Sequence, residues 1–336
     1  MINRKKSYLN YINYNKILIL INLISIILFI IYFKEISFEA QEIILNKFKY
    51  KKDYINHKFA IIQRECSPCG LFSFYMVLVG CVHNYLLKGF IPIIDLKSLP
   101  NVINGFNTSR TNPWELFFEQ PLGYKLEEVI KYAKNITYIR CGDCSPRPNQ
   151  NSMISSVPKK MFWHNIANNY ILIKKEIIDL SNKIIYKLFR NSKNILGVLA
   201  RGTDYIARKP KSHPIPPDVD TLINDVKMMD NIYKYDYIFF STEDERIRVK
   251  FTNYFKLKIK QLKPKIDIEY DYMKKDFINN NKDIKGNIEF NKLYLLNIII
   301  LSKCTDIIAA RCSGTAGIFI LTNGFRNFKV YDLGVY

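Results

Sequence analysis

Short, continuous apolar runs alternate with longer segments of mixed polarity through the second half of the 336-residue chain. Runs of this kind are typical of strands buried on both faces, and the segments between them have helical periodicity. The alternation predicts a parallel sheet covered by helices. The predicted strands are residues 195–200, 237–240, 266–269, 306–310 and 329–331, and the predicted helices are 217–229, 244–256, 289–302 and one from about 315.

The first half shows the same pattern on a smaller scale. A strand at 59–62 leads through Gly70 into an apolar helix that ends near Gly89, and a second strand, 91–95, finishes on Asp95. Strand, glycine turn, helix and strand make a βαβ unit. We therefore expect an α/β protein with two domains. Further predictions are a helix at 125–133, a strand at 136–139, a loop over 140–157, helix over 158–190, and domain bounds of 58–165 and 166–336.

Residues 17–33 are uncharged and almost wholly apolar, and seventeen residues is about the lower limit for crossing a bilayer. Basic residues precede this stretch and acidic residues follow it, which places residues 1–16 in the cytoplasm. No small-residue cleavage site follows, so we expect an uncleaved transmembrane signal anchor and then a stem over residues 34–57. The alternative is a helix that lies on the membrane or packs on the protein.

Such an anchor predicts a single-pass membrane protein, in the Golgi or secretory lumen of a eukaryote or the inner membrane of a bacterium. Glycosylation sequons at Asn107 and Asn135 would suit a secretory lumen.

The composition excludes a disordered chain, since 48% of residues are hydrophobic and 14% aromatic. The formal net charge of +20 favours anionic partners such as nucleoside diphosphates or lipid head groups. The basic residues are spread along the chain without an arginine-rich tail, and we expect no nucleic-acid partner.

Seven cysteines at low density do not make a disulfide scaffold. Cys66 with Cys69 and Cys141 with Cys144 form two CxxC pairs, for which small disulfides or plain thiols are the first interpretation. A four-thiolate zinc site built from both pairs is the alternative.

Polar clusters follow three predicted strands of the second half. Arg201 to Asp204 follow the first strand, residues 241–245 the second, and residues 311–317 the fourth. Right-handed crossovers place all three clusters on one sheet edge, where α/β proteins bind ligands. An arginine there can bind a phosphate with two hydrogen bonds, and the glycine-rich start of the last helix offers free amides. The clusters together predict a nucleotide site. The alternatives are that Arg201 only pairs with Asp204 and that the acids only cap a helix.

Residues 112–123 in the first half gather Trp114, Glu119 and two phenylalanines. They suit a face that stacks on sugar rings, or a lid that packs on its own domain. Gly70 would allow close approach of a ligand, or simply a tight turn.

The chain resembles the fucosyltransferase superfamily, which includes α-1,6-fucosyltransferases, protein O-fucosyltransferases and Nod-factor fucosyltransferases, and within it a group of bacterial-type polysaccharide glycosyltransferases. The matching segments run from Gly70 to the C-terminus. They are CGLFSFYMVLVG with GFIPIIDL, NPWELFFEQPLGY, LGVLARGTDY with KPKSHPIPP, FFSTEDE, and SGTAGIFILTNGF with YDLGVY.

The resemblance implies a GT-B fold, in which two Rossmann-like domains face each other and the second binds the donor. It implies an inverting transfer of a sugar, with fucose expected, from a GDP-sugar to a glycan, without a cofactor or a metal ion. Arg201 then matches the arginine that binds the donor diphosphate. The family's α-1,6 enzymes carry an arginine where this chain has Gly202 and a glutamate where it has Lys209, so the resemblance does not extend to that linkage.

These arguments select three groups of candidate residues. The catalytic candidates are Arg201, Asp204 and His213, with Asp95 and Glu119 as further candidates for a base. The donor-binding candidates are Arg201, Gly202, Thr203, Lys211, Thr242, Asp244, Ser313, Gly314 and Thr315, and the acceptor-side candidates are Gly70, Asp95, Trp114 and Glu119. The alternatives to a GDP-sugar enzyme are an enzyme for another nucleotide sugar and a non-catalytic basic module that binds anionic glycan or a membrane surface.

Overall fold

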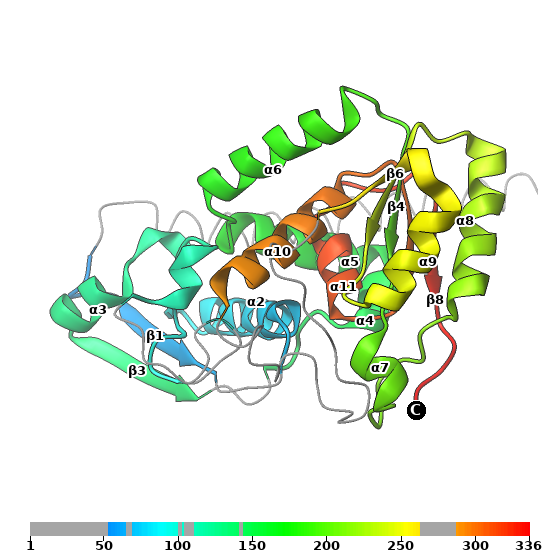
Figure 1. Cartoon of the computed structure of the whole chain (residues 1–336). Helices are drawn as coiled ribbons and strands as arrows, with labels where there is room; N and C mark the ends of the chain where they lie inside the picture. The colour runs from blue at the N-terminus through cyan, green and yellow to red at the C-terminus, as the bar shows by residue number, and fades with distance from the viewer. Residues whose placement is uncertain (1–52, 65–68, 100–102, 104–110, 141–143, 263–286) are drawn as a thin grey trace, which may run out of the picture. The chain divides into compact units, whose positions relative to one another are not determined.

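The computed structural model describes residues 53–64, 69–99, 103, 111–140, 144–262 and 287–336 (Figure 1). Asp53–Tyr336 form one compact unit, which begins close to the predicted end of the stem. This unit contains two separate parallel sheets. The predicted α/β class with parallel sheets is therefore confirmed, while the division into domains 58–165 and 166–336 stays a prediction.

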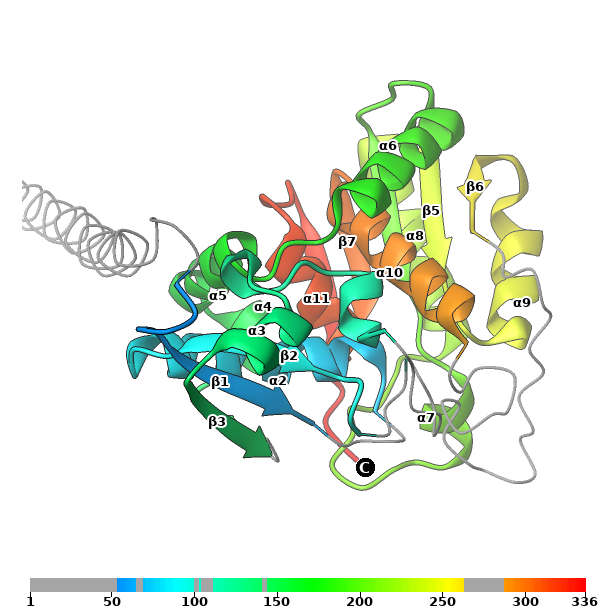
Figure 2. The ribbon, with the colours of Figure 1, turned by 90° about the vertical axis from the view of Figure 1, so that its left-hand side faces the viewer.

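The first sheet has the strand order β2-β1-β3. Helix α2, an apolar helix buried over most of its length, connects β1 to its parallel neighbour β2, so the predicted βαβ unit is present. Figure 2 shows this sheet with α2 close to it. The elements of this part are β1 (Lys58–Gln63), α2 (Leu71–Leu87), β2 (Ile91–Asp95), the 3₁₀ helices η1 (Pro113–Leu116) and η2 (Pro121–Gly123), α3 (Leu126–Tyr132) and β3 (Asn135–Arg140).

The second sheet has the order β6-β5-β4-β7-β8, with every pair parallel. Its core contains Val198, Phe240, Phe251 and Ile308, contributed by β4, β5, α9 and β7. The elements are α4 (Gln150–Ser155), α5 (Val157–Tyr170), α6 (Lys175–Phe189), β4 (Ile195–Leu199), α7 (Thr203–Ala207), α8 (Val219–Tyr233), β5 (Tyr237–Ser241), α9 (Glu245–Phe255), η3 (Lys256–Lys258), β6 (Ile259–Lys260), α10 (Ile288–Ser302), β7 (Asp306–Ala310), α11 (Ser313–Leu321) and β8 (Phe328–Tyr331).

The structure differs from the predicted elements at four places. The expected loop at 140–157 contains α4, and the expected helix at 158–190 is two helices, α5 and α6. Between them the chain is extended, because Glu119 N donates to Leu172 O and Lys174 N to Phe117 O. Helix α7 and strand β6 were also missed. The predicted strand 266–269 lies outside the described residues.

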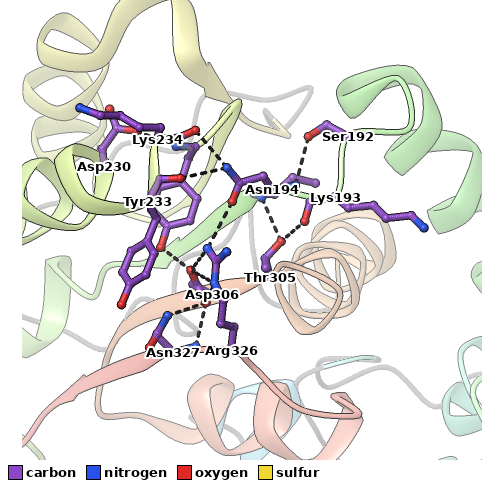
Figure 3. Close-up of polar contacts among 12 residues, drawn as sticks. Ser192, Lys193, Asn194, Asp230, Tyr233, Lys234, Thr305, Asp306, Arg326 and Asn327 are labelled. Atoms are coloured by element: carbon purple, nitrogen blue, oxygen red, sulfur yellow. Dashed lines mark hydrogen bonds and ion pairs between the residues drawn. The ribbon is translucent and has the colours of Figure 1, made fainter.

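A buried polar network ties together the amino ends of the strands in the second sheet (Figure 3). Asp306 is fully buried and accepts hydrogen bonds from the Tyr235 hydroxyl, Arg326 Nη2 at 2.6 Å and Asn327 N at 2.7 Å. Burial alone would raise the pKa of Asp306, but these hydrogen bonds lower it below its ordinary value. The network thus stabilises the edge of the sheet opposite the three polar clusters.

The predicted single-pass membrane localisation needs correction. Among the helices that the structure describes, none combines the length and the apolar character needed to cross a bilayer, which contradicts that prediction. The predicted anchor, residues 17–33, lies outside the described residues, as does the sequon at Asn107.

The cysteine pairing also differs from the zinc alternative. Cys144 forms a disulfide with Cys81, which belongs to neither CxxC pair, and Cys69 is disulfide-bonded as well. Because two of the four sulfur atoms are used in disulfides, the two pairs do not form a four-thiolate zinc site. Cys304 and Cys312 are buried free thiols.

Candidate functional site

The carboxyl ends of β4, β5 and β7 open into a cavity of about 370 Å³. Neighbouring parallel strands all end on the same side, so the clusters that follow them meet there, as the sequence pattern predicted. Helix α10 and the start of α2, which connects two strands of the first sheet, also contribute to the lining. Seven predicted site residues line the cavity: Gly70, Arg201, Asp204, His213, Thr242, Ser313 and Gly314.

Arg201 follows β4 and is the central cation of this cavity. Its Nη1 lies 2.9 Å from Glu243 Oε1 and its Nη2 lies 3.1 Å from Asp204 Oδ1, and its side chain is only 18% exposed. Burial alone would lower the pKa of Arg201, but the carboxylates of Glu243 and Asp204 raise it well above its ordinary value. Arg201 is therefore permanently charged. Within the described part of the chain its buried Nε has no hydrogen-bond partner.

Glu243 is a cavity residue that the candidate groups omitted. It follows β5 and accepts a hydrogen bond of 2.9 Å from Gly202 N in addition to its ion pair with Arg201. Burial raises the pKa of Glu243 above its ordinary value, although Arg201 opposes this shift. A carboxylate with a raised pKa is better matched to accepting a proton near neutral pH. The signal was present in the sequence, since Glu243 belongs to the second polar cluster.

Asp244, the predicted donor-binding acid of that cluster, lies outside the cavity lining. It caps α9 by accepting from Arg246 N and Ile247 N, and its Oδ2 accepts from Thr203 N at 2.8 Å. Thr203 is fully buried with φ +41°, and a Cβ atom at Gly202 would overlap the Asp244 carboxylate. Gly202, Thr203 and Asp244 thus build the turn beneath Arg201, and their predicted contact with a donor stays untested.

Helix α11 presents its amino end to the cavity. The helix begins at Ser313, its N-cap residue Cys312 makes no side-chain capping bond, and its first turn holds no acidic residue. Ser313 and Gly314 line the cavity, so free backbone amides and the positive end of the helix dipole are available to an anion there. Thr315 is buried behind them, and its hydroxyl donates to Ala310 O.

The start of α2 provides the wall from the first sheet. Gly70 is the N-cap of α2, with φ −70°. Phe72 packs against α11, where a Cβ atom at Gly317 would overlap its ring, and its ring centroid lies 5.8 Å from that of Tyr294. The cavity is therefore shared by residues from both halves of the compact unit.

The remaining predicted residues lie outside the cavity lining. Trp114 is buried, stacks on Phe118 at 4.2 Å and donates through Nε1 to Glu119 O, so its ring packs within the protein and not against the cavity. Asp95 ends β2 and accepts hydrogen bonds from Gln63 and Ser98. Glu119 and Lys211 are exposed. An acceptor-side role for these residues, and a donor role for Lys211, stay predictions.

Several further cavity residues were missed by sequence reasoning. Helix α10 contributes Asn291, Tyr294 and Asn297, a polar series at three-residue spacing on a largely apolar helix. Asn297 is 7% exposed, and among the described residues its Oδ1 has no hydrogen-bond partner. Their spacing was a usable signal, because polar residues on one face of an apolar helix need polar surroundings. Arg248 and Gln261 also line the cavity.

No family model and no curated protein sequence matches the chain. Among solved structures, it is similar to NodZ α-1,6-fucosyltransferase soaked with GDP-fucose, with a TM-score of 0.47 and 14% identity over 80% of this chain and 93% of that one. It is similar to fucosyltransferase NodZ from Bradyrhizobium, with a TM-score of 0.47 and 14% identity over 80% and 94%. It is also similar to POFUT1 in complex with GDP-fucose, with a TM-score of 0.45 and 8% identity over 85% and 99%. Identities of 8–14% and TM-scores below 0.5 carry no functional argument. The function proposed below therefore depends on the residues that line the cavity.

Proposed function

We propose that the protein is a glycosyltransferase that takes a sugar from a nucleoside-diphosphate donor and transfers it to a glycan. The observation that carries this proposal is that the guanidinium of Arg201 and the open amino end of α11 line one cavity. A permanent cation and free amides on adjacent strand ends suit the two phosphates of such a donor.

The same groups would assist departure of the diphosphate. Transfer of the sugar leaves negative charge on the β-phosphate, and preorganised donors stabilise this charge in the transition state. Arg201, Ser313 and Gly314 line the cavity, which supports their assignment to this role. We accordingly propose an inverting transfer in which these groups, without a metal ion, stabilise the leaving diphosphate.

Several acids and bases surround the same space. Asp204, His213 and Glu243 line the cavity, whereas Asp95 and Glu119 do not. The residue that removes the proton from an acceptor hydroxyl is thus to be sought among the first three, and we propose Glu243, whose pKa is raised by burial, as the one to test first. The cavity volume of about 370 Å³ lies within the usual range for small-molecule sites.

We propose GDP-fucose as the donor to test first. The sequence motifs resemble fucosyltransferases, and the two parallel sheets that both contribute to the cavity suit the GT-B arrangement implied by that resemblance. A different nucleotide sugar would use the same diphosphate contacts and differ at the base and the sugar.

Donor turnover tests this proposal. The full chain is incubated with radiolabelled GDP-fucose, UDP-sugars and CDP-sugars, with and without EDTA, and released sugar is measured with water as the acceptor. We expect saturable, EDTA-resistant turnover of GDP-fucose that falls at least about 100-fold in Arg201→Lys, because lysine keeps the charge but loses the paired contact.

Arg326→Lys is the matched control, since Arg326 also pairs with a buried aspartate but lies at the opposite edge of the same sheet. It should lower thermal stability and leave turnover per folded molecule unchanged. Equal turnover in wild type and Arg201→Lys would reject the proposed role of Arg201. Turnover of a UDP- or CDP-sugar alone would keep the transfer and replace the donor.

A further inference from the structure

The end of the chain is hydrogen-bonded to the loop that carries His213. Ser212 N donates to Tyr336 O at 3.1 Å, Tyr336 N donates to His213 O at 3.0 Å, and Ile215 N donates to Gly334 O at 3.1 Å. Pro214 and Val335 form an antiparallel bridge between these hydrogen bonds. In Figures 1 and 2 the C-terminus accordingly lies beside α7, close to where this loop begins.

From this loop, two successive side-chain contacts lead to Arg201. The rings of His213 and Tyr205 meet edge to face with centroids 5.5 Å apart. The Tyr205 ring in turn lies under the guanidinium of Arg201, with Cζ 4.3 Å from the ring centroid. Tyr205 is 8% exposed, and all three side chains line the cavity.

Helix α7 and the loop that follows it have little intrinsic stability. Helix α7 has only five residues, too few for hydrogen bonds within the helix to stabilise it alone. Lys209 and Ser212 have left-handed φ values of +48° and +63°, which side-chain-bearing residues adopt only when their surroundings require it. The pairing with residues 334–336 is therefore a main external constraint on this loop.

The contacts of Arg201 divide between two kinds of restraint. Glu243 and Asp204 hold two guanidinium nitrogens within the plane of the group. The Tyr205 ring lies against the guanidinium carbon and so limits how far the plane of the group can tilt. Paired contact with a phosphate depends on the orientation of the plane, so a change in tilt would weaken binding without removing the charge.

We propose that residues 334–336, His213 and Tyr205 act as one positioning unit that orients the guanidinium of Arg201 for the diphosphate. Tyr205 and His213 are positioning residues here, and residues 334–336 act on Arg201 through them. This inference rests on the proposed function, because it assumes that Arg201 binds a diphosphate.

The first measurement needs no ligand. In NMR spectra of the full chain, the Nε–H signal of Arg201, assigned by its absence from Arg201→Lys, should be shifted upfield by the Tyr205 ring. The shift should be lost in Tyr205→Leu and reduced in a chain ending at Leu333, and it should persist in Tyr205→Phe. Were the shortened chain to fail to fold, Tyr336→Pro replaces it, with Tyr336→Ala as its control, since proline removes the amide that donates to His213 O and alanine removes only the side chain.

The second measurement is GDP affinity by calorimetry. Tyr205→Leu and the shortened chain should each bind GDP about tenfold more weakly, which corresponds to about 1.4 kcal/mol. The two changes combined should be little weaker than either alone, because they act through the same unit. Tyr205→Phe should bind like wild type. Tyr233→Leu is the matched control, since Arg326 Cζ lies 4.7 Å over that ring away from the cavity, and its GDP affinity should not change.

The two hypotheses fail in different ways. Failure of the wild-type protein to bind GDP would refute the proposed function. The NMR shifts would still report whether residues 334–336 orient Arg201. GDP binding that requires Arg201, together with unchanged affinity and unchanged Arg201 signals in both Tyr205→Leu and the shortened chain, would overturn the positioning unit alone.

Discussion

At the scale of single residues, the site is defined by how three charged side chains share one buried space. Arg201 is held by Glu243 and Asp204, so the cation is fixed before any ligand binds. Such preorganisation avoids the cost of orienting a long side chain during the reaction.

Glu243→Gln tests whether this acid accepts a proton. Glutamine keeps a side-chain oxygen for Gly202 N but loses the charge. Because burial raises the pKa of Glu243, kcat/KM of wild type should fall as the pH drops through a pKa above the ordinary value of 4.5. In Glu243→Gln, we expect kcat to fall about 100-fold and this acid limb to disappear. The exposed Glu176→Gln should change neither. An unaltered acid limb in Glu243→Gln would exclude Glu243 as the base.

Sequence reasoning located the residues near the site better than it predicted which side chains face it. Arg201 and Ser313 were found because the position after a parallel strand fixes their place. Asp244 and Thr203 occupy equivalent places, yet they turn inward to cap α9 and to close the turn after β4. The direction of each side chain depends on local backbone angles, such as the positive φ of Thr203, that no sequence pattern shows.

At the scale of elements, α11 contributes to both the site and the packing. Its amino end faces the cavity, while Gly317, one turn further on, allows Phe72 of α2 to approach its backbone closely. The helix is buried over most of its length and carries small residues where neighbours come close. A change at this contact should therefore be felt by both sheets.

Gly317→Ala tests this contact. The new methyl group would overlap the Phe72 ring, and we expect a loss of about 1–3 kcal/mol in the free energy of unfolding, measured by urea denaturation. Phe72→Leu should relieve the overlap, so the double variant should be more stable than the sum of the two single changes predicts. Strictly additive effects would show that the two residues do not meet.

The elements that sequence reasoning missed are those determined by distant parts of the chain. Strands β4, β5 and β7 were placed to within a residue, since their apolar runs are continuous. The break between α5 and α6 was missed because residues 171–173 are apolar and fit a helix as well as a strand. It arises from hydrogen bonds to Phe117 and Glu119, more than fifty positions earlier. The loop that follows α7 is likewise hydrogen-bonded to residues 334–336, more than a hundred positions later.

At the scale of the whole molecule, two parallel sheets in one compact unit both contribute to a single cavity. The net charge of +20 gave little information about this site, since Arg201 and Arg248 share the cavity lining with Asp204 and Glu243. The apolar stretch at 17–33 suggested a membrane location that the described helices do not support. The positions of the polar clusters after the strands were a better guide to the cavity than the bulk composition was.

The most direct test is a crystal structure of the full chain with GDP. We predict that the diphosphate lies in the cavity, with one phosphate hydrogen-bonded to the guanidinium of Arg201 and the other to the backbone amides of Ser313 and Gly314. GDP bound elsewhere, or bound in the cavity with its phosphates away from both Arg201 and the start of α11, would contradict this account.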